Sequence, residues 1–559
     1  MRCKNFLITG SIMLAVLLII NSCNYSQITL KNIDPKENVE NSMQTLILVN
    51  MYALTETYPK AALDIQQAVE TFAQRHNAQV LDIGQVYRSK TGQHLSVPAY
   101  PNPALTAMAK EIKSEIISHT DGQLDTLILV GDESIIPMWE IRLGNEHIHT
   151  DSFYADLDGD GMPEVAMTRV LGNAEAMQRQ LSTTTEIGGP AATILCSEDT
   201  RIHLETQRFL NALSQQGHNV TVLGRGGSEQ LPTSDLIIHF GHGSPQRLSN
   251  RFGETFLSAK GMPALNRHPI AIVDGCATTP PGSALLRAFL NNGCRAYIGS
   301  TATVWGMTPA RYANQLVIHF LDTYEMHPEW SIAKLLTVAR AKYIDVTRLS
   351  EMLLELEESE VLFVRGDAYR HLMTFLGWHA YGAPFAHLHQ GVAQTVFAKR
   401  PLVEDRVLLT AGKENALEAT FELTTDDGQP ILFLRAEWLN SISESLTLRI
   451  QQNGKTLHKL QGDANIIYQR IKDICVGGYI DGDVYHAYWL LPLEQSVGQN
   501  HLRVEIAGSG AFQPLFNVIR ARQNRVQGGQ ANPERELRIL PASAIEIWPE
   551  WETIEAPEN

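Results

Sequence analysis

Short, continuously apolar runs that alternate with segments of helical spacing dominate the chain between Thr45 and Ser300. The runs Thr45–Asn50, Thr126–Val130 and Ile270–Asp274 are apolar at nearly every position. Strands buried on both faces of a sheet have this character, and strands that are separated by helices pair in parallel. The alternation therefore predicts an α/β fold with a mainly parallel sheet covered by helices.

The alternating pattern comes in two consecutive series, and the second begins at Ala192. Two series predict two α/β subdomains, residues 44–190 and residues 191–390, or else one long sheet. Within the second series, a short helix over Ser258–Asn266 is expected to connect the strand Leu236–Phe240 to the strand that follows it.

After the second series the character of the chain changes. Runs with β-type composition recur with turn residues between them, as in Ala416–Leu423, Val484–Leu491 and His501–Ala507, and no helical period persists. Short strands at such spacing predict an antiparallel, all-β sandwich over residues 391–545. An acidic tail, residues 546–559, follows it.

Residues 1–23 have the composition of an export signal. Arg2 and Lys4 give a positive start, and the apolar run Phe6–Ile20 is shorter than the about 20 residues of a spanning helix. The run is followed by a small residue and Cys23, which resembles a bacterial lipobox, in which Cys23 would be acylated. A plain signal peptide and an uncleaved anchor are the alternatives.

Residues 24–43 are polar and are expected to tether the folded part to the membrane. The predicted location is the bacterial cell envelope, as an exported lipoprotein of the outer membrane that faces the periplasm or the cell surface. The chain has 45 Lys and Arg against 61 Asp and Glu, a net charge of −16. This balance argues against nucleic acid as a partner, because phosphate binding needs a basic face.

Two glycine-containing motifs follow apolar strands in the second series: HFGHG, which contains His242, and DGC, which ends in Cys276. Ligands bind beyond the carboxyl ends of parallel strands, so these two side chains are expected to lie side by side. A thiolate is a strong nucleophile, an adjacent imidazolium lowers the pKa of a thiol, and the histidine can protonate a leaving amine. The N–H groups of Gly243 and Cys276 would hold the oxyanion, which predicts nucleophilic acyl transfer.

The stretches IIHFGHGS, AIVDGCATT and GCRAYIGSTATVWG resemble, in this order, those of the gingipain-like cysteine peptidases, a family related to caspases and legumains. The stretches LVGDESIIP and TDSFYADLDGDGMPEVAMTRV are also similar to that family. The resemblance covers residues 45–390. It implies a caspase-like catalytic domain and an endopeptidase that cleaves protein or peptide substrates through Cys276 and His242, without an organic cofactor.

The resemblance also implies roles for further residues. A carboxylate at the end of the strand that opens the second series would orient the histidine; this is Glu198, with Asp199 as the alternative. Trp305 would line the substrate pocket. His239 lies inside its strand and is expected to pack there or to line the pocket. A zinc site made of the two histidines and the cysteine is the remaining alternative.

Two other functions stay open on the same residues. The acyl-enzyme could be resolved by an amine instead of water, which would make the protein a transpeptidase with sortase-like activity. The chain could also be a non-catalytic binding lipoprotein on a degenerate gingipain-like scaffold.

Among the other cysteines, Cys196 and Cys294 lie in or beside core strands, where free cysteine behaves as a small hydrophobe. The alternative is that these two cysteines form a disulfide with each other.

A second motif offers oxygen ligands to a cation. Asp156, Asp158 and Asp160 alternate along the chain and are followed by glycine, a pattern that can wrap a hard cation. Met167 stands where an EF-hand needs Glu, so this is no EF-hand, but Glu164 can add a ligand. The motif predicts a structural calcium site, with a solvated acidic turn as the alternative.

Overall fold

The computed structural model describes residues 44–548, except 101, 103, 121–122, 184–187, 197–208, 211, 214–215, 225–228, 251–252, 308–310, 348, 365, 390–399, 402–406, 411–415, 425–428, 440–446, 462–474, 482–483, 508–535 and 540–543. The predicted signal, Cys23, the polar tether and residues 549–559 of the acidic tail therefore lie outside the described residues, whereas residues 546–548 of that tail belong to the strand Ala544–Trp548. The domain boundaries stay predictions.

The first series follows the predicted alternation, with an added hairpin after β3. Its elements are β1 (Thr45–Val49), α2 (Met51–Thr57), α3 (Ala62–His76), β2 (Gln79–Asp82), α4 (Ile83–Thr91), α5 (Ala104–Thr120), β3 (Thr126–Val130), β4 (Trp139–Leu143), β5 (Glu146–Thr150), the 3-10 turn η1 (Ser152–Ala155), β6 (Ala166–Val170) and α6 (Ala174–Ser182).

The second series carries both strands of the predicted dyad and ends in a helical region. Its elements are β7 (Ala191–Cys196), β8 (Asn219–Leu223), η2 (Leu231–Thr233), β9 (Leu236–Phe240), β10 (His242–Gly243), β11 (Arg247–Ser249), β12 (Thr255–Ser258), η3 (Ala259–Gly261), β13 (Ile270–Asp274), α9 (Ala284–Asn291), β14 (Ala296–Ser300), β15 (Gly306–Met307), β16 (Arg311–Tyr312), α10 (Ala313–Met326), α11 (Ile332–Thr347), α12 (Ser350–Ser359), β17 (Val361–Leu362), α13 (Asp367–Gly377) and β18 (Trp378–Gly382).

One ten-stranded sheet unites the two series, in the order β2-β1-β3-β6-β18-β14-β13-β9-β7-β8. The strands from β2 to β18 run parallel to one another and are called the first half here. The strands from β14 to β8 are also mutually parallel and form the second half. The halves meet antiparallel where Tyr297 of β14 lies opposite Tyr381 of β18. Of the two predicted arrangements, the protein has the single long sheet.

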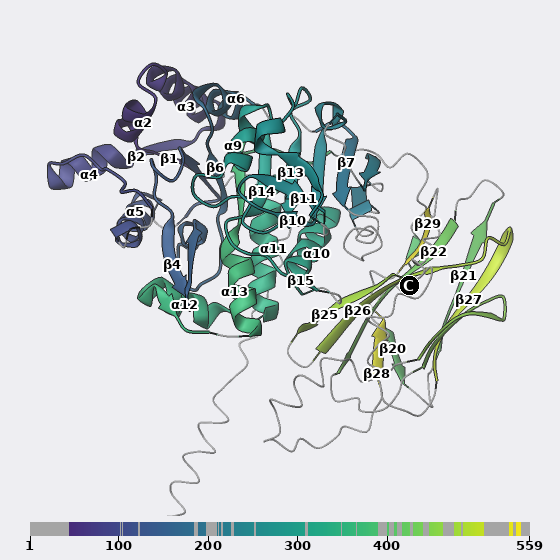
Figure 1. Ribbon diagram of the computed structural model, residues 1–559. Coiled ribbons are helices and arrows are strands. Elements are labelled where there is room, and N and C mark those ends of the chain that lie inside the picture. Colours follow the sequence, from purple (N-terminus) through teal and green to yellow (C-terminus); the bar gives the residue numbers. More distant parts are fainter. Residues whose placement is uncertain are drawn as a thin grey trace, which may run out of the picture. The chain divides into compact units, whose positions relative to one another are not determined.

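Alternate residues of a central strand enter different cores. Ile270 and Ile272 of β13 belong to the large cluster that contains residues of α10 and α11, whereas Ala271 and Val273 belong to a second cluster with α9. Helices therefore cover both faces of the sheet, as Figure 1 shows. Burial on both faces explains why these strands are apolar at successive positions, and it confirms the predicted α/β class.

A buried ion pair supports the first half. Two of the three guanidinium nitrogens of Arg169 on β6 donate to the Asp151 carboxylate, Nε at 2.8 Å and Nη2 at 2.6 Å. The third nitrogen donates to the carbonyls of Gly131 and Ile136, at 3.1 and 2.9 Å. Neither charged side chain is exposed by more than 2%. The two charges compensate each other away from water. The hydrogen bonds of Arg169 also join β6 to the loops after β3 and β5.

The connection between β9 and β13 differs from the prediction. Instead of a helix over Ser258–Asn266, a small antiparallel sheet, β10-β11-β12, is followed by the 3-10 turn η3. The prediction was wrong because the chain turns back at His242, and its polar residues then pair within this small sheet.

The C-terminal region is all-β, as predicted, and forms two antiparallel sheets (Figure 1). Alternate apolar residues are buried on three strands of its four-stranded sheet, namely Phe421 and Leu423, Leu448 and Ile450, and Leu502 and Val504, so one face of these strands packs inward. The strands are β19 (Arg400–Pro401), β20 (Val407–Thr410), β21 (Ala416–Leu423), β22 (Gln429–Leu439), β23 (Thr447–Gln452), β24 (Lys455–Gln461), β25 (Cys475–Asp481), β26 (Val484–Pro492), β27 (Gly498–Ala507), β28 (Glu536–Ile539) and β29 (Ala544–Trp548).

Candidate active site

The two motifs of the predicted dyad leave the sheet from neighbouring strands. β9 and β13 pair in parallel, and their last residues, Phe240 and Asp274, lie opposite each other. The residues that follow, up to His242 on one side and Cys276 on the other, therefore start from adjacent positions at the same edge of the sheet.

Glycines allow these two segments to touch. A Cβ on Gly243 would lie 2.5 Å from Thr278 Cγ2 and 3.0 Å from the Cys276 amide nitrogen. A Cβ on Gly275 would lie 3.1 Å from the backbone of Gly243. A side chain at position 243 would force its neighbours to shift, and one at position 275 would make an unusually tight contact, so both glycines favour the close approach of the two backbone segments. The contact also places the amides of Gly243 and Cys276, the predicted oxyanion donors, in touching segments.

His242 is presented to solvent. It pairs with Ser249 across the short β10–β11 ladder, and its side chain is exposed. Gly241, just before it, is also needed for close approach, because a Cβ there would lie 2.5 Å from the Ser249 carbonyl oxygen. The small sheet thus fixes the backbone on both sides of His242 and leaves the imidazole free to meet a substrate.

Cys276 is partly buried, and its thiol is held in the protonated form. Sγ donates a hydrogen bond to the Val304 carbonyl oxygen at 3.3 Å. Burial raises the pKa of the Cys276 thiol above its usual 9.0, and the Asp274 carboxylate acts in the same direction. The direction of this shift is opposite to the lowering that a neighbouring imidazolium was expected to cause.

The backbone after the cysteine adopts an unusual conformation. Ala277 has a φ of +46°, in the left-handed region that a residue with a Cβ rarely enters. Two hydrogen bonds hold the loop to the end of β14: Ala277 N to Ala302 O at 2.8 Å, and Thr279 N to Ser300 O at 2.9 Å. A strained backbone conformation of this kind persists only where several surrounding contacts hold it in place.

Trp305 lies next to the residue that binds the thiol. It is partly buried, and its ring meets that of Tyr369 on α13 edge-on, with centroids 5.7 Å apart. Its carbonyl accepts the amide of Ala313 at 3.0 Å. Contribution of Trp305 to a substrate pocket stays a prediction, supported by its place in the chain beside Val304.

His239 is packed in the interior, the first of its two expected roles. It has no exposed surface. Its Nε2 lies 3.1 Å from the Ser249 carbonyl oxygen, and its ring meets Phe256 edge-on. Burial lowers the pKa of His239 to about 4, so it stays neutral at physiological pH. With no exposed surface, His239 offers nothing to a substrate in this structure.

The third predicted member of the catalytic set, Glu198, and its alternative Asp199 lie outside the described residues. The strand before them does have the expected neighbour, since Cys196 at the end of β7 lies opposite Phe240 of β9. Cys196 and Cys294 are both buried, and no disulfide joins them, so the alternative of a disulfide between them is wrong.

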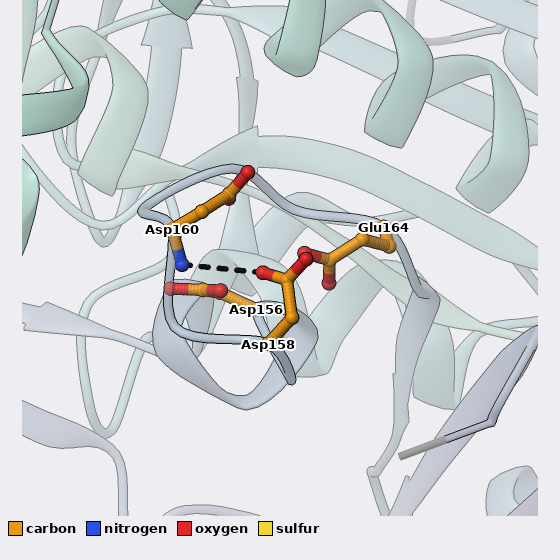
Figure 2. Close-up of side chains that lie close together, drawn as sticks. All are labelled: Asp156, Asp158, Asp160 and Glu164. Atoms are coloured by element: carbon orange, nitrogen blue, oxygen red, sulfur yellow. Dashed lines mark hydrogen bonds between the residues drawn. The ribbon is translucent and has the colours of Figure 1, made fainter. Parts of the chain in front are cut away.

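The acidic motif forms a cluster at the loop before β6, drawn in Figure 2. One carboxylate oxygen from each of Asp156, Asp158, Asp160 and Glu164 lies within 4.8 Å of the others. Desolvation raises the pKa of Asp156 to about 6 and that of Glu164 to about 8. Oxygen ligands alone, crowded at one loop, form a donor set that fits a hard cation such as calcium.

Two parts of the site were missed by the sequence argument. The Val304 carbonyl, which accepts the thiol proton, carries no signal in the sequence because any residue has a carbonyl. Asp274 is the first residue of the DGC motif, so its carboxyl group, two residues before Cys276, was a signal that the sequence contained. Burial raises the pKa of Asp274 to about 7.

Among the described residues, no helix is both long enough and apolar enough to cross a bilayer.

Residues 45–194 match the family model of peptidase family C25. The matched segment ends before His242 and Cys276. No curated protein matches the chain.

Solved structures of low sequence identity cover most of the chain. The crystal structure of the Arg-specific cysteine proteinase gingipain R (RgpB) is 14% identical, covers 84% of this chain and 98% of its own, and has a TM-score of 0.43. A complex of the RgpB pro- and mature domains from Porphyromonas gingivalis is 13% identical, covers 83% and 99%, and also has a TM-score of 0.43. The family-model match over residues 45–194 agrees with the resemblance to gingipain-like peptidases that the sequence shows in that segment.

Proposed function

We propose that this chain belongs to the gingipain-like C25 peptidases and is a cysteine endopeptidase that cleaves protein or peptide substrates through Cys276 and His242. The observation that carries the proposal is the contact between Gly243 and the Gly275–Cys276 segment. It supports the pairing because it places the nucleophile and the base on two backbone segments that touch, as acyl transfer by a Cys–His pair requires.

The proposed reaction begins when a substrate carbonyl approaches Cys276. The thiol proton moves to the His242 imidazole, sulfur bonds to the carbonyl carbon, and the oxyanion accepts the N–H groups of Gly243 and Cys276. The imidazolium then gives its proton to the leaving amine as the C–N bond breaks, which leaves a thioester. Glu198 would orient the imidazole, and Trp305 would line the pocket for the substrate side chain.

Water completes the cycle. His242 takes a proton from water as its oxygen attacks the thioester carbonyl, and the C–S bond breaks. The carboxylic acid product leaves, and the proton returns from the imidazolium to the Cys276 sulfur. If an amine takes the place of water, the same acyl-enzyme yields a new peptide bond, which is the transpeptidase alternative.

A diverse peptide library, incubated with the wild type and with Cys276→Ala, tests the proposal. We expect cleavage products with the wild type only. Identical product profiles from the two proteins would remove the catalytic assignment, and no products from either would favour the binding lipoprotein. A parallel incubation with an added amine nucleophile separates hydrolysis from transfer, since only transfer gives peptides extended by that amine.

We further propose that the loop cluster of Asp156, Asp158, Asp160 and Glu164 holds a structural calcium ion. The crowding of four carboxylates within one loop supports this, because a bound cation would offset their mutual repulsion. The ion would supply no chemistry to the reaction. Its role would be to fix the chain between η1 and β6.

Export and anchoring complete the proposal. Acylation of Cys23 in the cell envelope would attach the enzyme to the outer membrane, with residues 24–43 as its tether. Metabolic labelling with a palmitate analogue tests this: label on the wild type and none on Cys23→Ser is expected. Label on both proteins, or on neither, would contradict it.

A further inference from the structure

The turn after β3 in the first half of the sheet reaches the loop that follows Cys276 in the second half. Asp132 makes this turn rigid: its Oδ1 accepts the amide of Ser134 at 3.0 Å and the hydroxyl of the same residue at 2.5 Å. Its Oδ2 lies 2.9 Å from Nη2 of Arg287 on α9. The carboxylate of Asp132 therefore has partners on both sides, and it fixes where the next residue points.

Glu133 is that next residue, and it contacts the loop directly. Its Oε1 accepts the amide of Gly282 at 2.6 Å and lies 3.2 Å from Arg287 Nη2. Only 15% of the Glu133 side chain is exposed. A charged acceptor on a backbone amide makes a stronger hydrogen bond than a neutral one, so this contact fixes the position of Gly282.

Gly282 is the far end of the loop that begins at the nucleophile. It has a φ of +74° and precedes Ser283, the residue that caps α9 by accepting the amide of Leu286 at 3.2 Å. The Ser283 hydroxyl also donates to the carbonyl of Thr278 at 2.6 Å, which links this end back to the residues just after Cys276.

The near end of the loop is where the strain lies. Ala277 adopts its left-handed conformation directly after Cys276 and is held by the end of β14. Release of either end of the loop would let Ala277 relax toward an ordinary φ, and that relaxation would turn the Cys276 side chain. Contacts at both ends are therefore needed to aim the thiol.

We propose that Glu133 is a positioning residue that aims Cys276 by anchoring the far end of its loop to the first half of the sheet. This rests on the proposed function in one respect, that Cys276 is the nucleophile. A nucleophile displaced by a fraction of an ångström loses rate although substrate binding is kept. Loss of Glu133 should consequently lower kcat more than it changes KM.

The test compares Glu133→Ala and Glu133→Gln in peptide cleavage and in alkylation of Cys276 by iodoacetamide. Glu133→Ala removes the acceptor. We expect kcat to fall by about ten-fold or more and KM to stay within about two-fold of the wild type. The alkylation rate constant of Cys276 should also differ from that of the wild type by about ten-fold or more. Glu133→Gln keeps an oxygen for the Gly282 amide and should restore most of kcat. Asp125→Ala is the matched control, because Asp125 also accepts a backbone amide, that of Gln44 at 2.9 Å, at the other end of β3.

Each outcome decides the proposal. Glu133→Ala with kcat and alkylation within two-fold of the wild type would overturn it, as would an equal loss in Asp125→Ala. If Glu133→Ala does not fold, Glu133→Asp is read in the same way, because its shorter side chain keeps the charge and withdraws the oxygen from Gly282. If the wild type cleaves no peptide, the proposed function fails, whereas the alkylation rates still report whether Glu133 aims Cys276.

Discussion

The Cys276 thiol donates its hydrogen bond to the carbonyl of Val304, at 3.3 Å. A thiolate has no proton to donate and would face that carbonyl oxygen unfavourably. The site is thus arranged for the thiol and not for the thiolate, and the proposed attack by sulfur requires that this contact be broken.

The first prediction concerns the pH dependence of the thiol. Because burial raises the pKa of Cys276 above 9.0, its alkylation rate should keep rising with pH beyond 9 in the absence of substrate. The folded state holds this proton more tightly than the unfolded chain, so the stability it contributes is present below pH 9.0 and is lost as pH rises through the folded-state pKa. Mass spectrometry of the Cys276 peptide after timed alkylation gives the profile, with Cys276→Ala as background.

Asp274→Asn isolates one cause of this shift. The pKa of Asp274 is raised to about 7 by burial, so its carboxyl carries charge mainly above that pH. That charge raises the pKa of Cys276. The variant should therefore be alkylated faster than the wild type at pH 8 and at the same rate at pH 5. Coincident profiles at both pH values would show that Asp274 does not act on the thiol.

The second prediction concerns the buried pair in the first half of the sheet. Asp151→Ala leaves the Arg169 guanidinium without its counter-ion at a position that is 2% exposed. We expect a loss of about 3–5 kcal/mol in the free energy of unfolding, measured by urea denaturation. The exposed pair of Lys90 and Glu115 is the control, and Glu115→Ala should cost less than about 1 kcal/mol. Equal losses in the two variants would contradict the assignment.

The third prediction concerns calcium. If the cluster before β6 holds the ion, chelation should lower the Tm of the wild type, and added calcium should restore it. Asp158→Asn and Asp160→Asn, which remove charge from two of the ligands, should lower the Tm in calcium and make it insensitive to chelation. A wild-type Tm that is the same with and without chelator would remove the support for the site.

The sequence predicted most of the sheet because its strands are buried on both faces and are therefore apolar throughout. The central strands β9 and β13 have the predicted bounds, Leu236–Phe240 and Ile270–Asp274. The hairpin β4–β5 was missed, because polar residues such as Glu140 and Arg142 interrupt its pattern and its pairing is local. The antiparallel junction of β14 with β18 could not be predicted, since β18 comes from residues 378–382, far along the chain.

The site was predictable to the extent that it consists of side chains at strand ends. His242 and Cys276 follow buried strands and are flanked by glycines, and the contact between their segments explains why glycine stands there. The state of the thiol could not be predicted, because it depends on a carbonyl that the loop after β14 brings from 28 residues away. The anchor at Glu133 is equally non-local, 149 residues from Gly282.

The most direct test of the account is to trap the acyl-enzyme. The wild type is mixed with a peptide found to be cleaved, quenched in acid within one turnover, and digested for mass spectrometry. We predict a thioester on Cys276 that carries the amino-terminal part of the substrate, that is released by hydroxylamine, and that forms at least about 100-fold more slowly in His242→Ala. Cleavage that proceeds without an adduct on Cys276, or with an adduct on another residue, would contradict the account.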